Sequence, residues 1–544
     1  MGDRIARHAA LAGGIACGVM LLATGAFAAD MSAEDARIAR LEAAVASLQA
    51  QVQAQSGVAR ENLALKRQVD DLETQVAALK TTPATSATAP PPSSLAASLA
   101  GGVPHVATAD GEFSLNLHSI VQLDTAAYFQ DPPGPIATDL RRSGPALGFT
   151  SSNVDVSHAR ELKDGTNLRR ARIGVDGNAF GDFQYKLVFD FGGSGVENAG
   201  QLYEGWAQYS GLDPLKLRIG VFAPLEGLAD QDSPAAQPLL DRPASADIAR
   251  GFAAGEARIA AEVFGAGDHW LASAAVTGRT VGVINTGSPT GAPQTYSDPL
   301  AFVGRLAATP LYGDDWRIHF GVHASWLDRP ANISGPPAAF ATPVAEVVAF
   351  SDQAELRVDG TKLINTGAID AKHADEEGAE FAAQWRGLLV QSEYDRFHVQ
   401  RTASGVTDPH FEGWYVEGSW VLTGQARRYN AQTAAFDAPP VSRGVGAGGF
   451  GVVELALRYA DMNLDYHAGS PGSAPAADAI RGGDLETWSA GLNWYLNSVV
   501  RLALEGQHVN LQRLSPDAKT YQTPLGAQIG QSFNTVAVRS QLAF

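Results

Sequence analysis

Apolar and polar residues alternate with a period of two along most of the chain from about residue 111 to the C-terminus. Successive side chains of a β-strand point to opposite faces, so this alternation predicts strands with one apolar and one polar face. In residues 532–544 the apolar face ends on Phe544, while Thr535, Arg539 and Gln541 fall on the other face. Such a closing strand is typical of a transmembrane β-barrel, although a soluble β-sandwich could end in the same way.

About 16 such strands can be placed, an even number consistent with both ends of a barrel lying on the same side of the membrane. Short connections alternate with long ones, and aromatic residues gather at strand ends, as they do in interfacial girdles. The connection 424–449 is long where a short turn is expected, so either a strand is missed there or that turn is elaborated. The expected strands span residues 112–130, 167–180, 183–192, 200–210, 214–222, 255–265, 268–278, 300–309, 316–327, 376–386, 388–400, 411–423, 450–463, 485–496, 499–511 and 533–544.

Residues 30–80 follow a different, helical period. Apolar residues recur at spacings of three and four from Ile38 to Val52 and again from Leu65 to Leu79, the seam of an α-helical coiled coil. Asn62 occupies a core position of this seam, where a polar residue often specifies register and oligomer number. We expect a homo-oligomeric coil, with a trimer as the working expectation; a single amphipathic helix packed on the barrel is the alternative. Residues 81–110, rich in Pro, Ser, Thr and Ala, are expected to form a flexible linker.

Residues 1–29 have the features of a secretory signal peptide, with Arg4 and Arg7 before an apolar run and Ala26-Phe27-Ala28 near its end. The single cysteine, Cys17, lies in this segment, so the mature chain is expected to have no disulfide bond. No stretch after residue 29 is apolar and long enough to span a bilayer as a helix, which leaves a barrel as the way for this chain to cross a membrane. We therefore predict an all-β protein, an antiparallel transmembrane β-barrel over residues 111–544 with an N-terminal coiled coil.

The net charge of −18 disfavours nucleic acid as a partner. The predicted inward face of the barrel carries charges of both signs, which leaves two interpretations open. The wall forms either a cationic track that attracts anions or a set of ion pairs that neutralise one another. The pore-lining candidates are Arg170, Arg172, Lys186, Asp190, Lys216, Arg218, Arg317, Arg458, Arg501 and Arg539.

Other candidate motifs do not support catalysis or cofactor binding. The glycine-rich stretch 444–449 lacks the Lys-Ser/Thr and the strand–helix context of a nucleotide loop. His319 and His323 share a strand face but are too far apart along it to bind one metal ion without other ligands. No serine lies in a G-x-S-x-G elbow. We expect no enzymatic activity, no cofactor and no metal site.

Several segments, taken in order over residues 111–544, resemble the phosphate-selective porin O and P family of bacterial outer-membrane proteins. The matching stretches are residues 167–175, 181–187, 211–222, 413–424, 454–459 and 491–497 and the terminal Phe544. The resemblance implies a trimeric, 16-stranded barrel whose third external loop folds inward to narrow each pore. Some members of the family carry an N-terminal coiled coil.

One departure from the family pattern concerns the start of this third loop. Phosphate-binding members resemble G-x-F-K-x-P-F-G there, whereas residues 220–227 read GVFAPLEG, with Ala223 in place of the basic residue. The loop that follows is rich in acidic residues, which does not favour a tight phosphate site. Its constriction candidates are Asp230, Asp232, Asp241, Arg242, Asp247 and Arg250.

These observations favour a passive outer-membrane porin for small hydrophilic solutes and ions, with at most a weak preference for anions or phosphate. The expected partners are outer-membrane lipid and two further copies of the chain, with the coiled coil in the periplasm. The first alternative is a barrel-anchored tether, in which the coil contacts peptidoglycan and conduction is incidental. The second alternative is a soluble secreted β-protein or enzyme.

Overall fold

The structure is a computed structural model that describes residues 95–99, 102–130, 162–193, 200–253, 255, 257–281, 298–332, 346–516 and 525–544. The chain divides into two units, Met1–Pro90 and Pro91–Phe544, and all the described residues belong to the second. The expected signal peptide and coiled coil, and most of the expected linker, lie outside the described residues and stay predictions.

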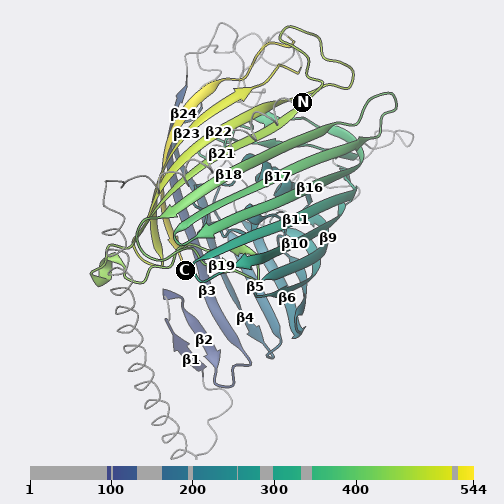
Figure 1. Cartoon of the computed structure of the whole chain (residues 1–544). Helices are drawn as coiled ribbons and strands as arrows, with labels where there is room; N and C mark the ends of the chain where they lie inside the picture. The colour runs from purple at the N-terminus through teal and green to yellow at the C-terminus, as the bar shows by residue number, and fades with distance from the viewer. Residues whose placement is uncertain are drawn as a thin grey trace, which may run out of the picture. The chain divides into compact units, whose positions relative to one another are not determined.

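Sixteen long strands form one closed antiparallel barrel (Figure 1). They correspond one to one to the expected strands. Most ends agree to within a few residues, but the strand expected at 376–386 begins at Ile369 and the one expected at 485–496 begins at Ile480. The strands are β3 (Ser114–Gln130), β4 (Gly165–Ala179), β5 (Phe183–Asp190), β6 (Gln201–Leu212), β7 (Leu215–Val221), β8 (Arg258–Gly267), β9 (Trp270–Thr280), β10 (Leu300–Tyr312), β11 (Trp316–Arg329), β16 (Ile369–Trp385), β17 (Leu388–Arg401), β18 (His410–Val421), β21 (Val452–Tyr466), β22 (Ile480–Tyr495), β23 (Val500–Gln512) and β24 (Ser532–Ala543). Each strand pairs with the next, and β24 pairs with β3 to close the ring, so the barrel has no open edge.

The two faces of each strand follow the alternation in the sequence. In β24 the side chains of Val536 and Val538 are each 46% exposed, while Thr535 and Arg539 are 2% and 1% exposed. The apolar residues therefore form the outer surface of the ring, and the polar residues are enclosed by it. This arrangement is the reverse of a soluble β-protein, and it is the one expected where the outer surface meets lipid.

Short secondary elements accompany the barrel within the described residues. A hairpin of β1 (Leu95–Ser98) and β2 (His105–Thr108) pairs with the start of β3 inside the range that we expected to be linker. No helix among the described residues is long and apolar enough to cross a membrane. The remaining elements are α3 (Leu228–Gln231), α4 (Ala244–Ala253), η3 (Val445–Ala447), β12 (Ala331–Asn332), β13 (Glu346–Val348), β14 (Ser351–Asp352), β15 (Ile364–Asn365), β19 (Tyr429–Asn430) and β20 (Ala435–Phe436).

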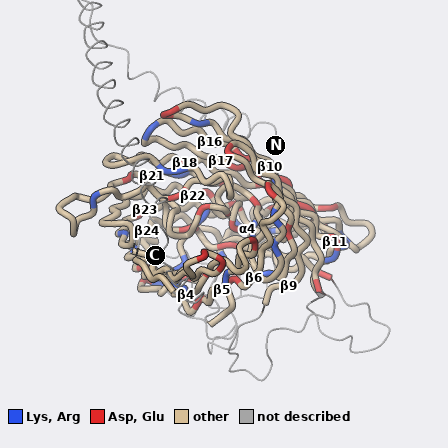
Figure 2. The backbone as a smooth tube through the Cα atoms, turned by 90° about the horizontal axis from the view of Figure 1, so that it is seen from below, with Lys and Arg blue, Asp and Glu red and all other residues tan. Residues whose placement is uncertain are grey.

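The connection between β7 and β8 folds into the ring of strands, and we call residues 222–257 the inward loop. Figure 2 shows α4, the main helix of this loop, enclosed by the strands. The helix forms in an alanine-rich segment, with Asp247 in its first turn and Arg250 in its last turn, where they complement the helix dipole. Gly255 follows with φ at 69°, a conformation that glycine adopts without strain.

The connection between β18 and β21 also enters the barrel, from the end at which the other connections are short. Phe436 is buried against Leu228 of the inward loop and against Ala382 and Leu389 of the wall. The long stretch at 424–449 is therefore an elaborated turn with a small β19–β20 hairpin, and no barrel strand is missing there. We call residues 425–441 the returning hairpin.

Candidate functional site: the barrel lumen

The inward loop is attached to the barrel wall by backbone groups as well as by side chains. The N–H groups of Leu228 and Ala229 donate to the Glu393 carboxylate on β17. Leu240 N–H donates to Glu505 Oε2 at 2.7 Å. Carboxylates accept strong hydrogen bonds from backbone N–H groups, so these wall residues hold the loop in one position.

Arginines of the wall and of the returning hairpin bind carbonyl groups of the same loop. Arg427 Nη1 donates to Ala236 O at 2.7 Å, and Arg458 Nη2 donates to Asp241 O at 2.7 Å. Arg501 Nη1 donates to Ala235 O at 3.3 Å. Each of these guanidinium groups thus donates to a carbonyl of the loop as well as to side chains of the lumen.

Asp241 connects the inward loop to the basic part of the wall. Its carboxylate lies 3.0 Å from Arg169 Nη2, 3.6 Å from Arg170 Nη2 and 3.8 Å from Arg539 Nη2. Burial opposes ionisation of this group, but the Arg169, Arg539 and Arg170 guanidinium groups outweigh it and hold the pKa of Asp241 well below its usual value. Asp241 is therefore an ionised anchor of the loop.

The other constriction candidates also have charged or polar partners, and all of them except the half-buried Asp247 are buried. Asp230 forms ion pairs with Arg250 and, at 3.9 Å, with Arg242, and Arg242 donates to Ala229 O at 3.0 Å. Asp247 forms an ion pair with Arg357 from the connection between β11 and β16. The structure brings all six candidates into the inward loop, where the charges of these residues stabilise the loop itself.

Asp232 is a buried loop acid whose charge is only partly compensated. It accepts hydrogen bonds from Gln391 Nε2 and Phe436 N–H, both at 3.3 Å. Burial raises the pKa of Asp232 to about 7, since the attraction of Arg427 only partly offsets the loss of hydration. This carboxyl group therefore titrates near neutral pH.

The pore-lining candidates of the wall lie on the inner face as expected, and most of them have charged or polar partners. Arg539 binds Asp124 through two bonds of 2.6 and 2.7 Å, and Arg172 lies 2.7 Å from Asp190. The others pair as follows: Arg170 with Gln122, Lys186 with Glu204, Lys216 with Gln432, Arg218 with Gln208 and Glu262, Arg317 with the Tyr429 ring, Arg458 with Glu355 and Glu417, and Arg501 with Asn493. That these residues line an ion path stays a prediction.

The charges of the wall are separated across the ring. Basic residues predominate on β4, which carries Arg169, Arg170 and Arg172, and on β24, which carries Arg539. Acidic residues predominate on β16 and β17, which carry Glu376, Glu380, Glu393 and Asp395. By strand order these two groups face each other across the barrel, with the inward loop between them.

Several residues of the lumen were not recognised in the sequence. Glu376 and Asp395 were not singled out, although Asp395 lies two residues from Glu393 and Glu376 lies four residues from Glu380, spacings that keep each pair on one strand face. Arg427 was hidden in the unexplained connection, and it binds Glu454 through bonds of 2.6 and 2.8 Å. The dyad spacing was a usable signal for the acids, whereas no local pattern marked Arg427.

Comparison with known proteins adds a sequence relationship to this geometry. The profile of the family described as phosphate-selective porin O and P matches residues 148–544. The chain is 23% identical to Porin O of Pseudomonas aeruginosa over 415 residues, which cover 74% of this chain and 84% of that protein. It is 22% identical over 426 residues to an uncharacterized protein of Caulobacter vibrioides, covering 71% of this chain and 78% of the relative.

Among solved structures, the chain is similar to an anion-selective porin from Comamonas acidovorans. The TM-score is 0.43 at 13% sequence identity, and the alignment covers 80% of this chain and 100% of the other.

Proposed function

Because this chain belongs to the phosphate-selective porin O and P family of outer-membrane channels, we propose that it is a passive porin for small hydrophilic solutes and ions with at most weak anion preference. The observation that carries the proposal is the closed barrel with an apolar outer face and a charged interior that holds an inward loop. Passage through such a channel needs a narrow point and side chains that bias the entry of ions, and it needs no covalent chemistry.

The pairing of the lumen charges supports weak selectivity. A strongly anion-selective pore needs cations whose charge is not neutralised nearby. Here Arg539 is neutralised by Asp124, Arg172 by Asp190 and Arg458 by Glu355 and Glu417. The acidic strands opposite further reduce the attraction for anions.

The same features argue against a tight phosphate site. Phosphate is bound best by several convergent cationic donors. At the start of the inward loop, Ala223 occupies the position of the basic residue that phosphate-binding members are expected to carry. Arg458 and Arg501 of the wall and Arg427 of the returning hairpin already donate to carbonyls of the loop itself.

The reversal potential of the full-length channel in planar bilayers under a KCl gradient tests the proposal. We expect a small potential of the sign for anion preference, with a chloride-to-potassium permeability ratio below about 3. Strong cation preference would contradict it, and block by submillimolar phosphate would show a binding site that Ala223 does not abolish. A protein that inserts into bilayers without conducting would contradict the porin function itself.

We further propose that the chain assembles as a homotrimer, with residues 30–80 as a periplasmic coil that supports the assembly. The expectation rests on the heptad pattern and the family resemblance. Chemical crosslinking of the full chain and of a chain lacking residues 30–80 measures this role. No observation on the described residues favours a peptidoglycan tether as the main function.

A further inference from the structure

Three neighbouring strands of the acidic wall place a histidine and two carboxylates together. In the strand register, His323 on β11 is opposite Gly378 on β16, and Gly378 is opposite Asp395 on β17. Glu376 lies two residues from Gly378 on the same face of β16. Gly378 has no side chain, and a Cβ at this position would overlap the His323 ring. The ring therefore extends over the middle strand and reaches both acids.

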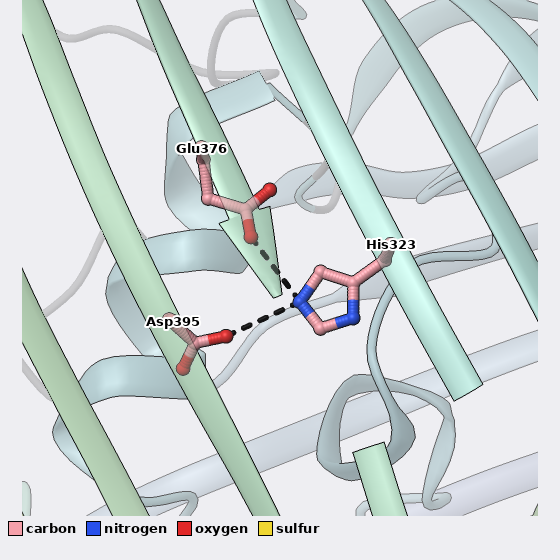
Figure 3. A group of neighbouring side chains, drawn as sticks. All are labelled: His323, Glu376 and Asp395. Atoms are coloured by element: carbon pink, nitrogen blue, oxygen red, sulfur yellow. Dashed lines mark hydrogen bonds and ion pairs between the residues drawn. The ribbon is translucent and has the colours of Figure 1, made fainter. Parts of the chain in front are cut away.

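The three side chains converge on one nitrogen atom (Figure 3). His323 Nε2 lies 3.2 Å from Glu376 Oε1 and 3.2 Å from Asp395 Oδ1. In a tetrahedral zinc site, ligand bonds of about 2.0–2.1 Å separate the ligand atoms by about 3.3–3.4 Å. The observed separations match this spacing to within about 0.2 Å.

The carboxylates of this group have capacity that protein donors do not use. Glu376 and Asp395 are each 1% exposed. Neither oxygen of Glu376, nor Asp395 Oδ2, makes a hydrogen bond of normal geometry with any residue that the structure describes. One Nε2–H cannot be directed at two carboxylates at once, and unsatisfied buried carboxylates are costly.

The other ring nitrogen is fixed by a separate set of contacts. His323 Nδ1 lies 3.2 Å from Glu380 Oε1. Glu380 in turn accepts bonds of 2.8 and 2.7 Å from Arg305 and lies 3.0 Å from His319 Nε2. When Nδ1 donates to Glu380, the Nε2 lone pair faces two acceptors, and a cation between them removes the repulsion. A carboxylate behind the distal ring nitrogen is the usual support of a metal-binding histidine.

A second possible group around the same histidine does not qualify. His323, Glu380 and Glu393 also lie close enough together to hold an ion. However, Glu380 is already bound by Arg305, and Glu393 accepts from Leu228 N–H, Ala229 N–H and Tyr415 Oη. Only the group with Glu376 and Asp395 retains unused ligand atoms.

We propose that His323, Glu376 and Asp395 bind a divalent transition-metal cation of the Zn²⁺ type on the acidic wall of the lumen. One imidazole nitrogen with two carboxylate oxygens suits Zn²⁺, whereas Ca²⁺ and Mg²⁺ prefer oxygen ligands alone. Such an ion joins β11, β16 and β17 and neutralises part of the acidic wall. The sequence predicted that His319 and His323 could not bind one metal ion without other ligands; in this proposal His323 alone takes part, with ligands from the two neighbouring strands.

The test is Zn²⁺ binding to the purified, folded full-length chain in detergent after treatment with EDTA. We expect one Zn²⁺ per chain whose affinity falls at least about 100-fold in the double variant E376Q/D395N and about 10- to 100-fold in E380Q. Asp190→Asn is the matched control, because it removes a buried wall carboxylate far from the group and leaves Zn²⁺ affinity unchanged. Heat-modifiable migration on a gel identifies the variants that have folded.

Two results overturn the proposal. One is a wild-type chain that binds Zn²⁺ no better than folded E376Q/D395N; the other is Zn²⁺ that millimolar Ca²⁺ displaces readily. X-ray absorption at the zinc edge of the wild-type chain provides a test that needs no variant. We expect imidazole scattering and a nitrogen/oxygen shell at about 2.0 Å, and a shell without imidazole contradicts the assignment of His323.

Discussion

Gly378 illustrates how a single residue without a side chain decides what its neighbours can do. It lies on the inner face of β16, between strands that carry His323 and Asp395. Gly321 and Gly227 are similar, because a Cβ at either would meet the carboxylate of Glu380 or of Glu393. Small residues thus provide the space in which the long acidic side chains of the lumen meet.

We predict that Gly378→Ala lowers the free energy of unfolding by about 1–3 kcal/mol, because its Cβ displaces the His323 ring. Urea unfolding followed by tryptophan fluorescence measures the change. Gly418→Ala on β18 is the control, since the nearest atom to its Cβ would be Leu389 O at 3.9 Å, an ordinary contact. If both substitutions change the free energy of unfolding equally, the loss at Gly378 does not come from displacement of the His323 ring.

Asp232 predicts a pH dependence of stability. Because burial raises its pKa from 3.8 to about 7, the native state retains a proton between about pH 4 and pH 7 that the unfolded chain releases. The contribution of Asp232 to the free energy of unfolding therefore falls as the pH rises through this window, and it levels off above it. Asp232→Asn removes this fall. We therefore expect the free energy of unfolding of the variant, relative to that of the wild type, to rise by on the order of 2–4 kcal/mol between pH 5 and pH 8.

Urea unfolding of both chains at several pH values checks this prediction. Other groups that titrate contribute equally to both chains, so the difference isolates residue 232. Asp314→Asn in the exposed turn between β10 and β11 is the control and should follow the wild type. Parallel pH curves for the wild type and Asp232→Asn contradict the prediction.

At the scale of elements, the inward loop is held by charges of both signs. Wall carboxylates bind its N–H groups at Leu228 and Leu240, a wall arginine binds its carbonyl at Ala235, and Arg427 of the returning hairpin binds its carbonyl at Ala236. The loop is thus a part of the barrel interior. Its position depends on residues from strands that are distant in sequence.

We predict that Asp241→Asn releases the loop, because Arg169, Arg170 and Arg539 lose their shared counter-charge. Breaking a buried ion pair costs about 3–5 kcal/mol. We expect a higher and noisier single-channel conductance together with this loss of stability. Asp190→Asn breaks a buried pair with Arg172 away from the loop, so it should destabilise the barrel without raising conductance.

The returning hairpin is the second element that narrows the lumen. Arg305 donates to Thr433 O and Ala434 O, and Tyr429 contacts His319 and Arg317 on the inner wall. We predict that replacing residues 425–441 with a short glycine-containing turn raises conductance by at least about twofold, since the segment occupies space in the channel. Shortening the exposed connection at residues 469–477 is the control and should leave conductance unchanged. Unchanged conductance in both variants would place the ion path elsewhere.

At the scale of the whole molecule, the outer face of the barrel is a continuous apolar surface. Leu457, near the middle of β21, is 66% exposed, and Leu306 on β10 is 59% exposed. A surface of this kind is stable only against lipid or detergent. The apolar side chains are therefore removed from water by lipid on the outer face, and the interior is held together by ion pairs and hydrogen bonds.

We predict that Leu457→Arg destabilises the barrel in lipid bilayers by about 2–4 kcal/mol, because the charge lies near the middle of the apolar surface. Leu215→Arg, at the first residue of β7 and next to a short turn, should cost only about 0–1 kcal/mol. Unfolding from liposomes in urea measures both changes. Equal costs at the two depths would contradict the membrane orientation.

The strands themselves could be predicted from local sequence, and all sixteen are confirmed. Alternation is a local property, so the sequence of each segment is enough to predict which of its residues lie on the apolar face and which on the polar face. The inner position of Arg170, Arg458 and Arg539 followed from the same pattern. What these side chains contact could not be read in this way, because Arg539 binds Asp124 and Arg458 binds Glu355 from distant parts of the chain.

The sequence alone determined the faces of the strands, because each segment has its own period of two, and it determined their number except for the open question at 424–449. It also limited the chemistry, since no local motif for catalysis is present. Only the tertiary structure decided which charges remain unpaired, because partners are chosen by strand register and a shift of one residue turns every side chain to the other face. In the closed ring Glu376 and Asp395 lie next to His323, and the connection at 424–449 folds into the lumen. These outcomes depend on contacts between segments that no local pattern records.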